Sequence, residues 1–323
     1  MKKIKITEIK GVKIGHAQNI KGATGCTVIL CQEGGVAGVD VRGGAPASRE
    51  TELLKSENTV EKVHGIFLSG GSAYGLDAAA GIMEYLEKIK KGFKVRGEIV
   101  PIVCGSSLFD LIVGDPKCRP DKKMGYEACL NSEKEEIKEG NVGAGTGASI
   151  GKINGIENAM KGGLGIYAIQ LGELKVGAVV AVNAFGDVID INTNEILAGL
   201  LNKEKNKLIS TEEEMYSQYE NLSKDTFSGN TTIGCIITNA KLTKAQMNKL
   251  ASISHNAYAK AISPVHTTVD GDAIFTLTTG EVEVNLDVVG ALATKVMGKA
   301  INRGILKAKS AYNLKSAEEM RKI

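Results

Sequence analysis

Residues 228–237 have the sequence Ser228-Gly229-Asn230-Thr231-Thr232-Ile233-Gly234-Cys235-Ile236-Ile237, in which small polar residues give way to an apolar, β-branched run. β-branched residues favour strands, whereas a Gly-Asn pair favours turns. The pattern predicts a buried strand that begins at Thr231, directly after a loop. A hydroxyl at such a junction, behind two conformationally permissive residues, indicates a turn under backbone strain.

Thr231 also has the chemistry that a self-cleaving precursor needs. Its hydroxyl can attack the carbonyl of Asn230 and convert the peptide bond to an ester, which water then hydrolyses. The product carries Thr231 as a new N-terminus, and such an α-amine has an ordinary pKa of about 7.7–8.0. The amine can then serve as the base for the hydroxyl of the same residue.

The segment before this junction differs in composition from the rest of the chain. Residues 202–228 are rich in Lys, Glu, Asn and Ser and contain few apolar residues. We expect this segment to be exposed and poorly packed, as a cleavage site requires.

Composition limits the class of protein. The chain has 323 residues, 43% of them apolar, with 39 glycines and no tryptophan, which suits one large α/β domain with an aliphatic core. The net charge is only +3, and positive and negative residues are mixed along the chain, which argues against a nucleic-acid-binding protein. The sequence has no run of 18 apolar residues and no apolar signal-peptide core, so we expect a cytoplasmic protein without a membrane span.

The cysteines and histidines predict no metal site, and no other cofactor is predicted. The six cysteines show no C-x-x-C spacing, and none of the four histidines lies at the spacing of a zinc motif. We expect free thiols that mostly pack in the core. We expect His16 to lie in a turn.

Apolar runs and glycine-rich turns define the expected elements. Predicted strands cover residues 4–6, 11–15, 26–30, 36–41, 63–68, 98–103, 164–171, 174–182 and 273–277. Predicted helices cover about 46–57, 76–89, 122–130, 243–261 and 286–303. A two-residue joint at 172–173 predicts a hairpin, Thr243 to Gln246 form a capping box, and the tail after residue 308 is expected to be loosely held.

Two glycine-rich loops could approach a ligand. Residues 69–75 follow a strand and precede a helix, but the G-x-G-x-x-G spacing is absent, so close packing is favoured. Here Gly70, Gly71 and Tyr74 are candidate substrate-lining residues. The second loop, 140–152, contains Gly145, a further candidate substrate-lining residue, and it fails the P-loop pattern. The simplest interpretation of Lys152 in this loop is a solvated surface lysine.

Three further polar residues end or begin apolar strands. Asn183 follows a buried strand, where it can offer an amide donor to a site or cap a turn, which is commoner. Asp270 and Asp272 flank a glycine at a strand entrance, so both can point to one site, unless they form an ordinary Asp-Gly turn. Calcium is not expected, because the other positions of an EF-hand loop are absent.

The chain resembles the DmpA-like family of self-processing N-terminal nucleophile hydrolases over nearly its whole length. This family includes L-aminopeptidase/D-esterases, β-aminopeptidyl peptidases and nylon-oligomer hydrolases. The matching motifs, in order, are Gly25-Cys26-Thr27-Val28, Ser69-Gly70-Gly71-Ser72-Ala73-Tyr74-Gly75-Leu76-Asp77-Ala78-Ala79, Phe109-Asp110-Leu111-Ile112-Val113-Gly114-Asp115, Gly143-Ala144-Gly145-Thr146-Gly147-Ala148, Lys161-Gly162-Gly163-Leu164-Gly165, Val182-Asn183-Ala184-Phe185-Gly186-Asp187, Asn230-Thr231-Thr232-Ile233-Gly234 and Asp270-Gly271-Asp272.

The resemblance implies a four-layer αββα sandwich, a variant of the N-terminal nucleophile hydrolase fold, often assembled as a tetramer. It also implies cleavage after Asn230, giving an α chain of residues 1–230 and a β chain of residues 231–323. The family's Ser or Thr nucleophile corresponds to Thr231, and its oxyanion-site asparagine corresponds to Asn183.

The pair that orients the family's nucleophile corresponds to Asp270 and Asp272. The first of these is Ser in the aminopeptidase branch and Asp in the nylon-hydrolase branch, which this sequence resembles here. A further site residue is Tyr in one branch and Lys in the other, and Lys152 matches the lysine.

These residues predict an autoproteolytic aminopeptidase or amidase that acts on small peptides, amides or esters through an acyl-Thr231 intermediate. An acyltransferase would use the same intermediate, with an amine in place of water. A non-catalytic small-molecule-binding oligomer is the alternative from another class, and the complete set of catalytic residues argues against it.

Overall fold

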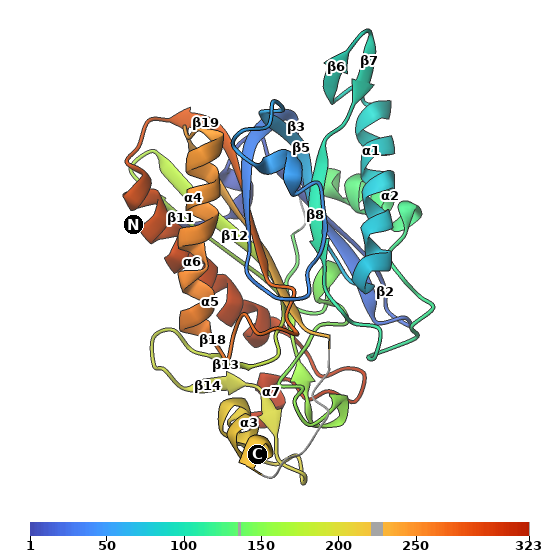
Figure 1. Cartoon of the computed structure of the whole chain (residues 1–323), viewed down its shortest axis with the longest axis vertical. Helices are drawn as coiled ribbons and strands as arrows, with labels where there is room; N and C mark the ends of the chain where they lie inside the picture. Colours follow the sequence, from blue (N-terminus) through green and yellow to red (C-terminus); the bar gives the residue numbers. More distant parts are fainter. Residues whose placement is uncertain (135–136, 221–228, 323) are drawn as a thin grey trace.

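The structure, a computed structural model, describes residues 1–134, 137–220 and 229–322. Its centre is a ten-stranded sheet (Figure 1). The order is β1 (Lys2–Ile4), β11 (Gly163–Leu171), β12 (Leu174–Asn183), β17 (Thr231–Ala240), β19 (Ala273–Val282), β3 (Thr24–Val41), β5 (Lys62–Ser69), β8 (Val103–Ser107) and β4 (Ala47–Arg49), with β2 (Lys13–Asn19) also paired to β3. The pairs β17–β19 and β5–β8 are parallel, and the other pairs are antiparallel.

Helices cover both outer faces of this sheet (Figure 1). The described helices are α1 (Ala78–Lys88), α2 (Lys122–Asn131), α3 (Thr211–Glu220), α4 (Lys244–Ser254), α5 (Asn256–Ala261), α6 (Leu286–Lys307) and α7 (Ala317–Met320). The remaining strands are short: β6 (Phe93–Val95), β7 (Glu98–Val100), β9 (Ser149–Ile150), β10 (Met160–Lys161), β13 (Asp187–Ile189), β14 (Ile196–Ala198), β15 (Leu200–Leu201), β16 (Leu208–Ile209) and β18 (Ile262–Ser263). Among the described helices, none is long and apolar enough to cross a membrane.

The two-residue period of the strands creates three apolar layers. On β12, Val180 and Val182 pack with α4, α5 and α6, whereas Val179 and Ala181 face the other half of the sheet. Phe67 of β5 packs toward α1 and α2 on the opposite outer face. The predicted αββα sandwich is therefore confirmed, with the refinement that its two β layers are halves of one continuous sheet joined by β19 and β3.

Several predicted elements are confirmed. The hairpin β11–β12 turns between Leu171 and Leu174. At the start of α4, the Thr243 side chain accepts the Gln246 N–H, and the Gln246 side chain accepts the Thr243 N–H at 2.9 Å, so the capping box forms. Such a cap stabilises a helix by about 1 kcal/mol.

Other local predictions are wrong. Residues 46–57 form β4 and a 3-10 turn rather than a helix, because the edge of β8 offers backbone partners to this segment. Residues 26–30 and 36–41 are parts of the one long strand β3. Residues 98–103 divide between β7 and β8 at Pro101, and the helix predicted over 243–261 is interrupted at His255.

Two further predictions are wrong: His16 was expected in a turn, and the tail after residue 308 was expected to be loosely held. His16 lies within β2, where its Nδ1 is 3.0 Å from the hydroxyl of Thr27. In the tail, Leu314 and Ala317 are buried, and Ser316 caps α7. The predicted exposed segment contains β16 and α3, and its last part, 221–228, lies outside the described residues.

Candidate active site

The ends of three strands meet at the predicted cleavage junction. In the antiparallel pair β12–β17, Asn183 lies directly opposite Thr231. Because β17 and β19 are parallel, they begin at the same edge of the sheet, and Asp272, just before β19, accepts the Thr232 N–H at 2.7 Å. Asn230 forms an isolated bridge with Asp270. The sheet itself thus brings distant residues together.

The Thr231 hydroxyl lies against the peptide bond that it is predicted to cleave. Its Oγ1 donates a hydrogen bond to the carbonyl oxygen of Asn230. The N–H of Gly271 donates to the same oxygen at 3.0 Å. A Cβ on Gly271 would lie 2.7 Å from Thr231 Oγ1, so only glycine fits here without displacing the hydroxyl. Two donors therefore polarise this carbonyl.

Lys152 is a buried residue of this site, so its interpretation as a surface lysine is wrong. Its Nζ lies 3.0 Å from both the backbone oxygen and the side-chain Oδ1 of Asn183. Burial lowers the pKa of Lys152 to about 7, although the negative charges of Asp270, Asp110 and Asp272 act in the opposite direction. The amine can therefore exchange a proton near neutral pH.

The orientation of the Asn183 amide follows from its partners. Its Oδ1 accepts the Ser149 N–H at 2.9 Å in addition to the Lys152 ammonium. The Nδ2 donates to the backbone carbonyl of Phe109 at 3.0 Å. An amide nitrogen carries two hydrogens, and the second has no acceptor among the residues that the structure describes. This N–H is available to an oxyanion.

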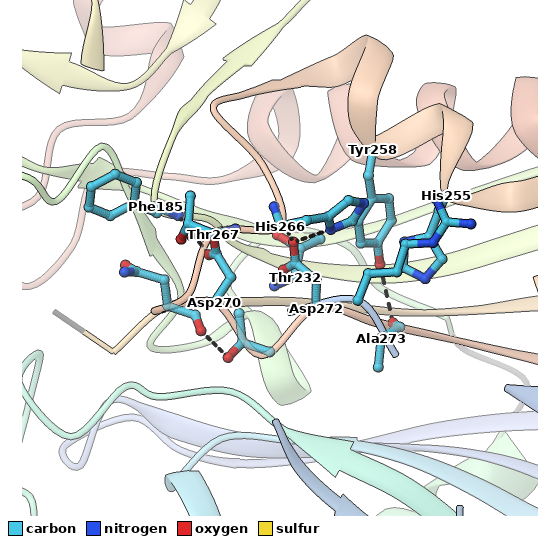
Figure 2. A network of polar contacts seen from close by, with 12 residues as sticks. Phe185, Thr232, His255, Tyr258, His266, Thr267, Asp270, Asp272 and Ala273 are labelled. Carbon is cyan, nitrogen blue, oxygen red and sulfur yellow. Dashed lines mark hydrogen bonds and ion pairs between the residues drawn. The ribbon is translucent and has the colours of Figure 1, made fainter. Parts of the chain in front are cut away.

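Asp270 is held in place from several sides (Figure 2). Its Oδ2 accepts from the hydroxyl and the N–H of Thr267, at 2.6 and 3.0 Å, and its Oδ1 accepts from the Phe185 N–H at 3.4 Å. Burial raises the pKa of Asp270 to about 6, the Asp272 charge adds to this, and the Thr267 hydrogen bonds and Lys152 oppose it. The carboxyl therefore titrates just below neutral pH.

The predicted substrate-lining residues Tyr74, Gly70 and Gly71 contact other residues than those of the cleavage junction. Tyr74 is 58% exposed, and the Arg119 guanidinium lies 3.5 Å from its ring centroid. The Gly71 N–H donates to Asp110 Oδ1 at 2.7 Å, and a Cβ on Gly70 would overlap the same carboxylate. None of these three has a described contact with Thr231, and their substrate role stays a prediction.

Gly145 leads to a residue that sequence reasoning missed. Lys161 is fully buried, and its Nζ donates to the carbonyls of Gly145, Ala148 and Gly162, each at 2.9 Å. Burial lowers the pKa of Lys161 to about 7, and the charge of Asp110 opposes this shift. The ammonium group of Lys161 thus links several carbonyls of the glycine-rich loop that carries Ser149 and Lys152, and it stabilises the conformation of that loop. The only sequence signal was its position in the family motif 161–165.

We expect the Lys161→Met variant to lose at least about 2 kcal/mol of unfolding free energy, because the carbonyls of Gly145 and Gly162 lose this donor at about 1–3 kcal/mol each, whereas the Ala148 carbonyl keeps the Gly162 N–H. Urea unfolding measures this loss. The matched control is Lys123→Met, on a side chain that is 83% exposed, which should change stability by less than about 0.5 kcal/mol. Equal stability of the two variants would contradict the role of Lys161.

Asp110 is a second buried charge that the sequence left without a role. Its Oδ2 accepts the Thr24 hydroxyl at 2.7 Å. Burial raises the pKa of Asp110 to about 6, and the hydrogen bonds from Thr24 and Gly71 oppose this. The carbonyl before it, that of Phe109, is the acceptor of the Asn183 amide. No group of three or more Cys, His, Asp or Glu in the described ranges could hold a metal ion.

The sequence is similar to those of known proteins over nearly its whole length. The sequence profile of Peptidase family S58 matches residues 5–318. An uncharacterized aminopeptidase of Mycobacterium leprae is 36% identical over 341 residues, covering 96% of this chain and 92% of the relative. A 6-aminohexanoate-oligomer endohydrolase of Kocuria sp. is 30% identical over 311 residues, covering 91% of this chain and 84% of the relative.

The fold is also similar to a solved structure, that of the L-aminopeptidase D-Ala-esterase/amidase of Ochrobactrum anthropi. The TM-score is 0.70 at 17% identity, with 98% of this chain and 91% of the other covered, and that protein is described as a variant of the Ntn hydrolase fold. The family resemblance inferred from the motifs is confirmed. The chain belongs to peptidase family S58 and is a hydrolase with a variant of the N-terminal nucleophile fold.

Proposed function

We propose that this chain is an aminopeptidase and amidase that activates itself by cleavage between Asn230 and Thr231. The observation that carries the proposal is the hydrogen bond from Thr231 Oγ1 to the carbonyl of the preceding residue, where the hydroxyl is in place to attack. The relatives named for aminopeptidase and oligomer-hydrolase activities support it. Small peptides, amides or esters are the proposed substrates.

Self-cleavage proceeds in two balanced steps. The Thr231 oxygen bonds to the carbonyl carbon of Asn230, the C–N bond breaks, and the hydroxyl proton passes to the leaving amine. Water then hydrolyses the ester and leaves a carboxylate on Asn230 and a free amine on Thr231. During the attack, the Gly271 N–H stabilises the negative charge that develops on the carbonyl oxygen.

The same groups then serve catalysis on a substrate. The Thr231 amine takes the hydroxyl proton, and the oxygen attacks the substrate carbonyl to form an acyl ester, which water hydrolyses. The second N–H of Asn183 donates to the oxyanion, and removal of one such donor lowers kcat by about 10²–10³ in another acyl-transfer enzyme. Asp270 and Asp272 orient the nucleophile. In its protonated form, Lys152 disfavours protonation of the nearby amine by like-charge repulsion.

Burial explains why cleavage should come first. Thr231 is only 3% exposed, and its hydroxyl is occupied by the Asn230 carbonyl. A substrate can reach the nucleophile only after Asn230 has moved away. We propose in addition that the active form is a cytoplasmic homo-oligomer, with the tetramer of similar proteins as its expected size.

The test of this function is whether activity appears together with cleavage. Freshly purified chain, sampled over time at neutral pH, should gain hydrolysis of aminoacyl p-nitroanilides in proportion to the cleaved fraction measured by mass spectrometry. Full activity in an uncleaved chain would contradict activation by cleavage. Added acceptor amine distinguishes an acyltransferase, which would form a new amide in place of free acid.

We expect the rate of self-cleavage to rise with pH between about 5 and 8. We propose that the neutral amine of Lys152 takes up the Thr231 hydroxyl proton during the attack, before that proton reaches the leaving amine. Because the pKa of Lys152 is lowered to about 7, the amine is protonated below that pH and cannot do so there. Asp270, whose pKa is raised to about 6, becomes neutral at still lower pH and no longer orients the nucleophile as a carboxylate. Rates measured by mass spectrometry at fixed ionic strength check this, and a flat profile over the range would contradict it.

A further inference from the structure

Two of the four histidines of the chain lie beside the candidate site, and the proposed mechanism does not use them. Figure 2 shows His266 between Asp272 and the side chains of Tyr258 and His255. His266 comes from the loop between β18 and β19, and the other two come from the α4–α5 region. This cluster joins the helical layer to the start of the nucleophile strand.

Both oxygens of the Asp272 carboxylate have partners. Oδ1 accepts the Thr232 N–H at 2.7 Å, so it fixes the main chain directly after the nucleophile. Oδ2 accepts the N–H of His266 at 3.2 Å, and Nδ1 of the same residue lies at 2.8 Å. The carboxylate is 1% exposed, so no bulk water replaces these donors. The orientation of Asp272 therefore depends on His266.

The imidazole of His266 is itself held in one orientation. Its ring packs edge-on against His255, with centroids 4.8 Å apart, and is stacked with Tyr258 at 5.9 Å. Nε2 of His255 lies 3.0 Å from the carbonyl of Asp40, which anchors the second ring to β3. The backbone of His266 has φ of 58°, in the left-handed region, which histidine, asparagine and aspartate adopt more often than other non-glycine residues.

The hydrogen-bonding pattern of the ring points to Asp272 alone. Because Nδ1 faces a carboxylate oxygen, it carries a hydrogen and donates. Nε2 is buried and has no partner among the residues that the structure describes. If the imidazole of His266 only filled space, it would not need a hydrogen-bond donor at Nδ1. The contacts thus indicate that the imidazole of His266 serves to hold the carboxylate of Asp272.

We propose that His266 is a positioning residue that holds Asp272 in the orientation from which it fixes the backbone of Thr231 and Thr232. This role rests on the proposed function, in which Thr231 is the nucleophile. Before cleavage, the contact keeps the hydroxyl in line with the Asn230 carbonyl. After cleavage, it prevents the carboxylate from rotating onto the new α-ammonium group, where it would stabilise the protonated form of the base that the reaction needs.

Three variants of His266 test the proposal. H266L has no donor but a volume close to that of histidine, and H266N carries an amide that can donate from nearly the position of Nδ1. H266G also lacks the donor and adopts a φ of 58° without strain, so it controls for misfolding of the leucine variant. Each is compared with the wild type by self-cleavage rate, by kcat and KM of the cleaved enzyme, and by thermal unfolding.

We expect H266L and H266G to cleave themselves about 10- to 100-fold more slowly than the wild type, since misplacement of reacting groups by about 1 Å can cost about 10²-fold. In the cleaved enzyme the same loss should fall on kcat, with KM within about twofold, because substrate binding is not changed. H266N should retain most of the rate. External imidazole should restore part of the rate to H266G only.

The outcomes separate this proposal from the one on which it rests. A wild type that cleaves normally, together with H266L and H266G variants at the same rate, overturns the role of His266 and leaves the function standing. An H266N variant as slow as H266G, with equal thermal stability, also overturns it, because the donor would then be irrelevant. A wild type that never cleaves or hydrolyses overturns both.

Discussion

The Thr231→Val variant is expected to remain a single chain of 323 residues and to show no hydrolytic activity. Valine keeps the shape and β-branching of threonine, so the buried strand β17 should form unchanged. The substitution removes the hydroxyl that donates to the Asn230 carbonyl and that is proposed to attack it. Loss of the nucleophile in a serine protease lowers kcat on the order of 10⁶-fold. Gel electrophoresis and substrate hydrolysis measure both effects.

Two matched variants make this result specific. Thr232→Val changes the next residue, also fully buried, whose hydroxyl has no partner in the described part of the chain, and it should still cleave. Thr231→Ser keeps a hydroxyl and should cleave as well. Cleavage of Thr231→Val at the wild-type rate would exclude this residue as the nucleophile.

We expect the Gly271→Ala variant to cleave itself at least about 100-fold more slowly than the wild type, the cost of misplacing reacting groups by about 1 Å. The new methyl group would lie 2.7 Å from Thr231 Oγ1 and 2.8 Å from the carbonyl oxygen of Ala45. Ordinary carbon–oxygen contacts are longer, so either the hydroxyl or the loop must shift. The Gly271 N–H, which donates to the Asn230 carbonyl, would move with the loop.

A glycine elsewhere in the sheet controls for the general cost of the substitution. A Cβ on Gly65 in β5 would have its nearest neighbour, Leu30 Cδ2, at 3.4 Å, which is an ordinary contact. Gly65→Ala should therefore leave the cleavage rate unchanged. If Gly271→Ala cleaved as fast as Gly65→Ala, neither the steric argument nor the donor role of the Gly271 amide would stand.

The junction and its partners could be predicted because their signals are local. The change from Gly229-Asn230 to a β-branched run located the start of β17 at Thr231, as the structure has it. Asn183 was found because it lies at the end of an apolar run, and the pair Asp270 and Asp272 because it lies directly before one. That these ends meet is a property of strand pairing, which the family resemblance implied and the register shows.

The buried charges could not be recognised in the same way. Lys152 and Lys161 lie in glycine-rich loops whose composition is typical of a surface, and their burial depends on the partners that the fold supplies. Lys152 needs the end of β12, and Lys161 needs three carbonyls from its own loop region. Most of these acceptors are backbone carbonyls, which every residue carries, so no pattern of residue types identifies them. The motif resemblance alone suggested that Lys152 belongs to the site.

The same limit applies to β4 and to His266. Residues 47–49 pair with the edge of β8, which lies more than fifty positions away in sequence, so their charged neighbours favoured a helix in the local pattern. His266 lies in a loop, two positions after Pro264, and no sequence motif marks it. Its contact with Asp272 follows from a left-handed backbone and from two rings on α4–α5.

The most direct test of self-cleavage is the intact mass of the wild-type protein after long incubation at neutral pH. The account predicts two species, whose masses correspond to residues 1–230 and 231–323, with an N-terminal threonine on the smaller one. A single species with the mass of the full chain would contradict the central claim that Thr231 cleaves the bond before it.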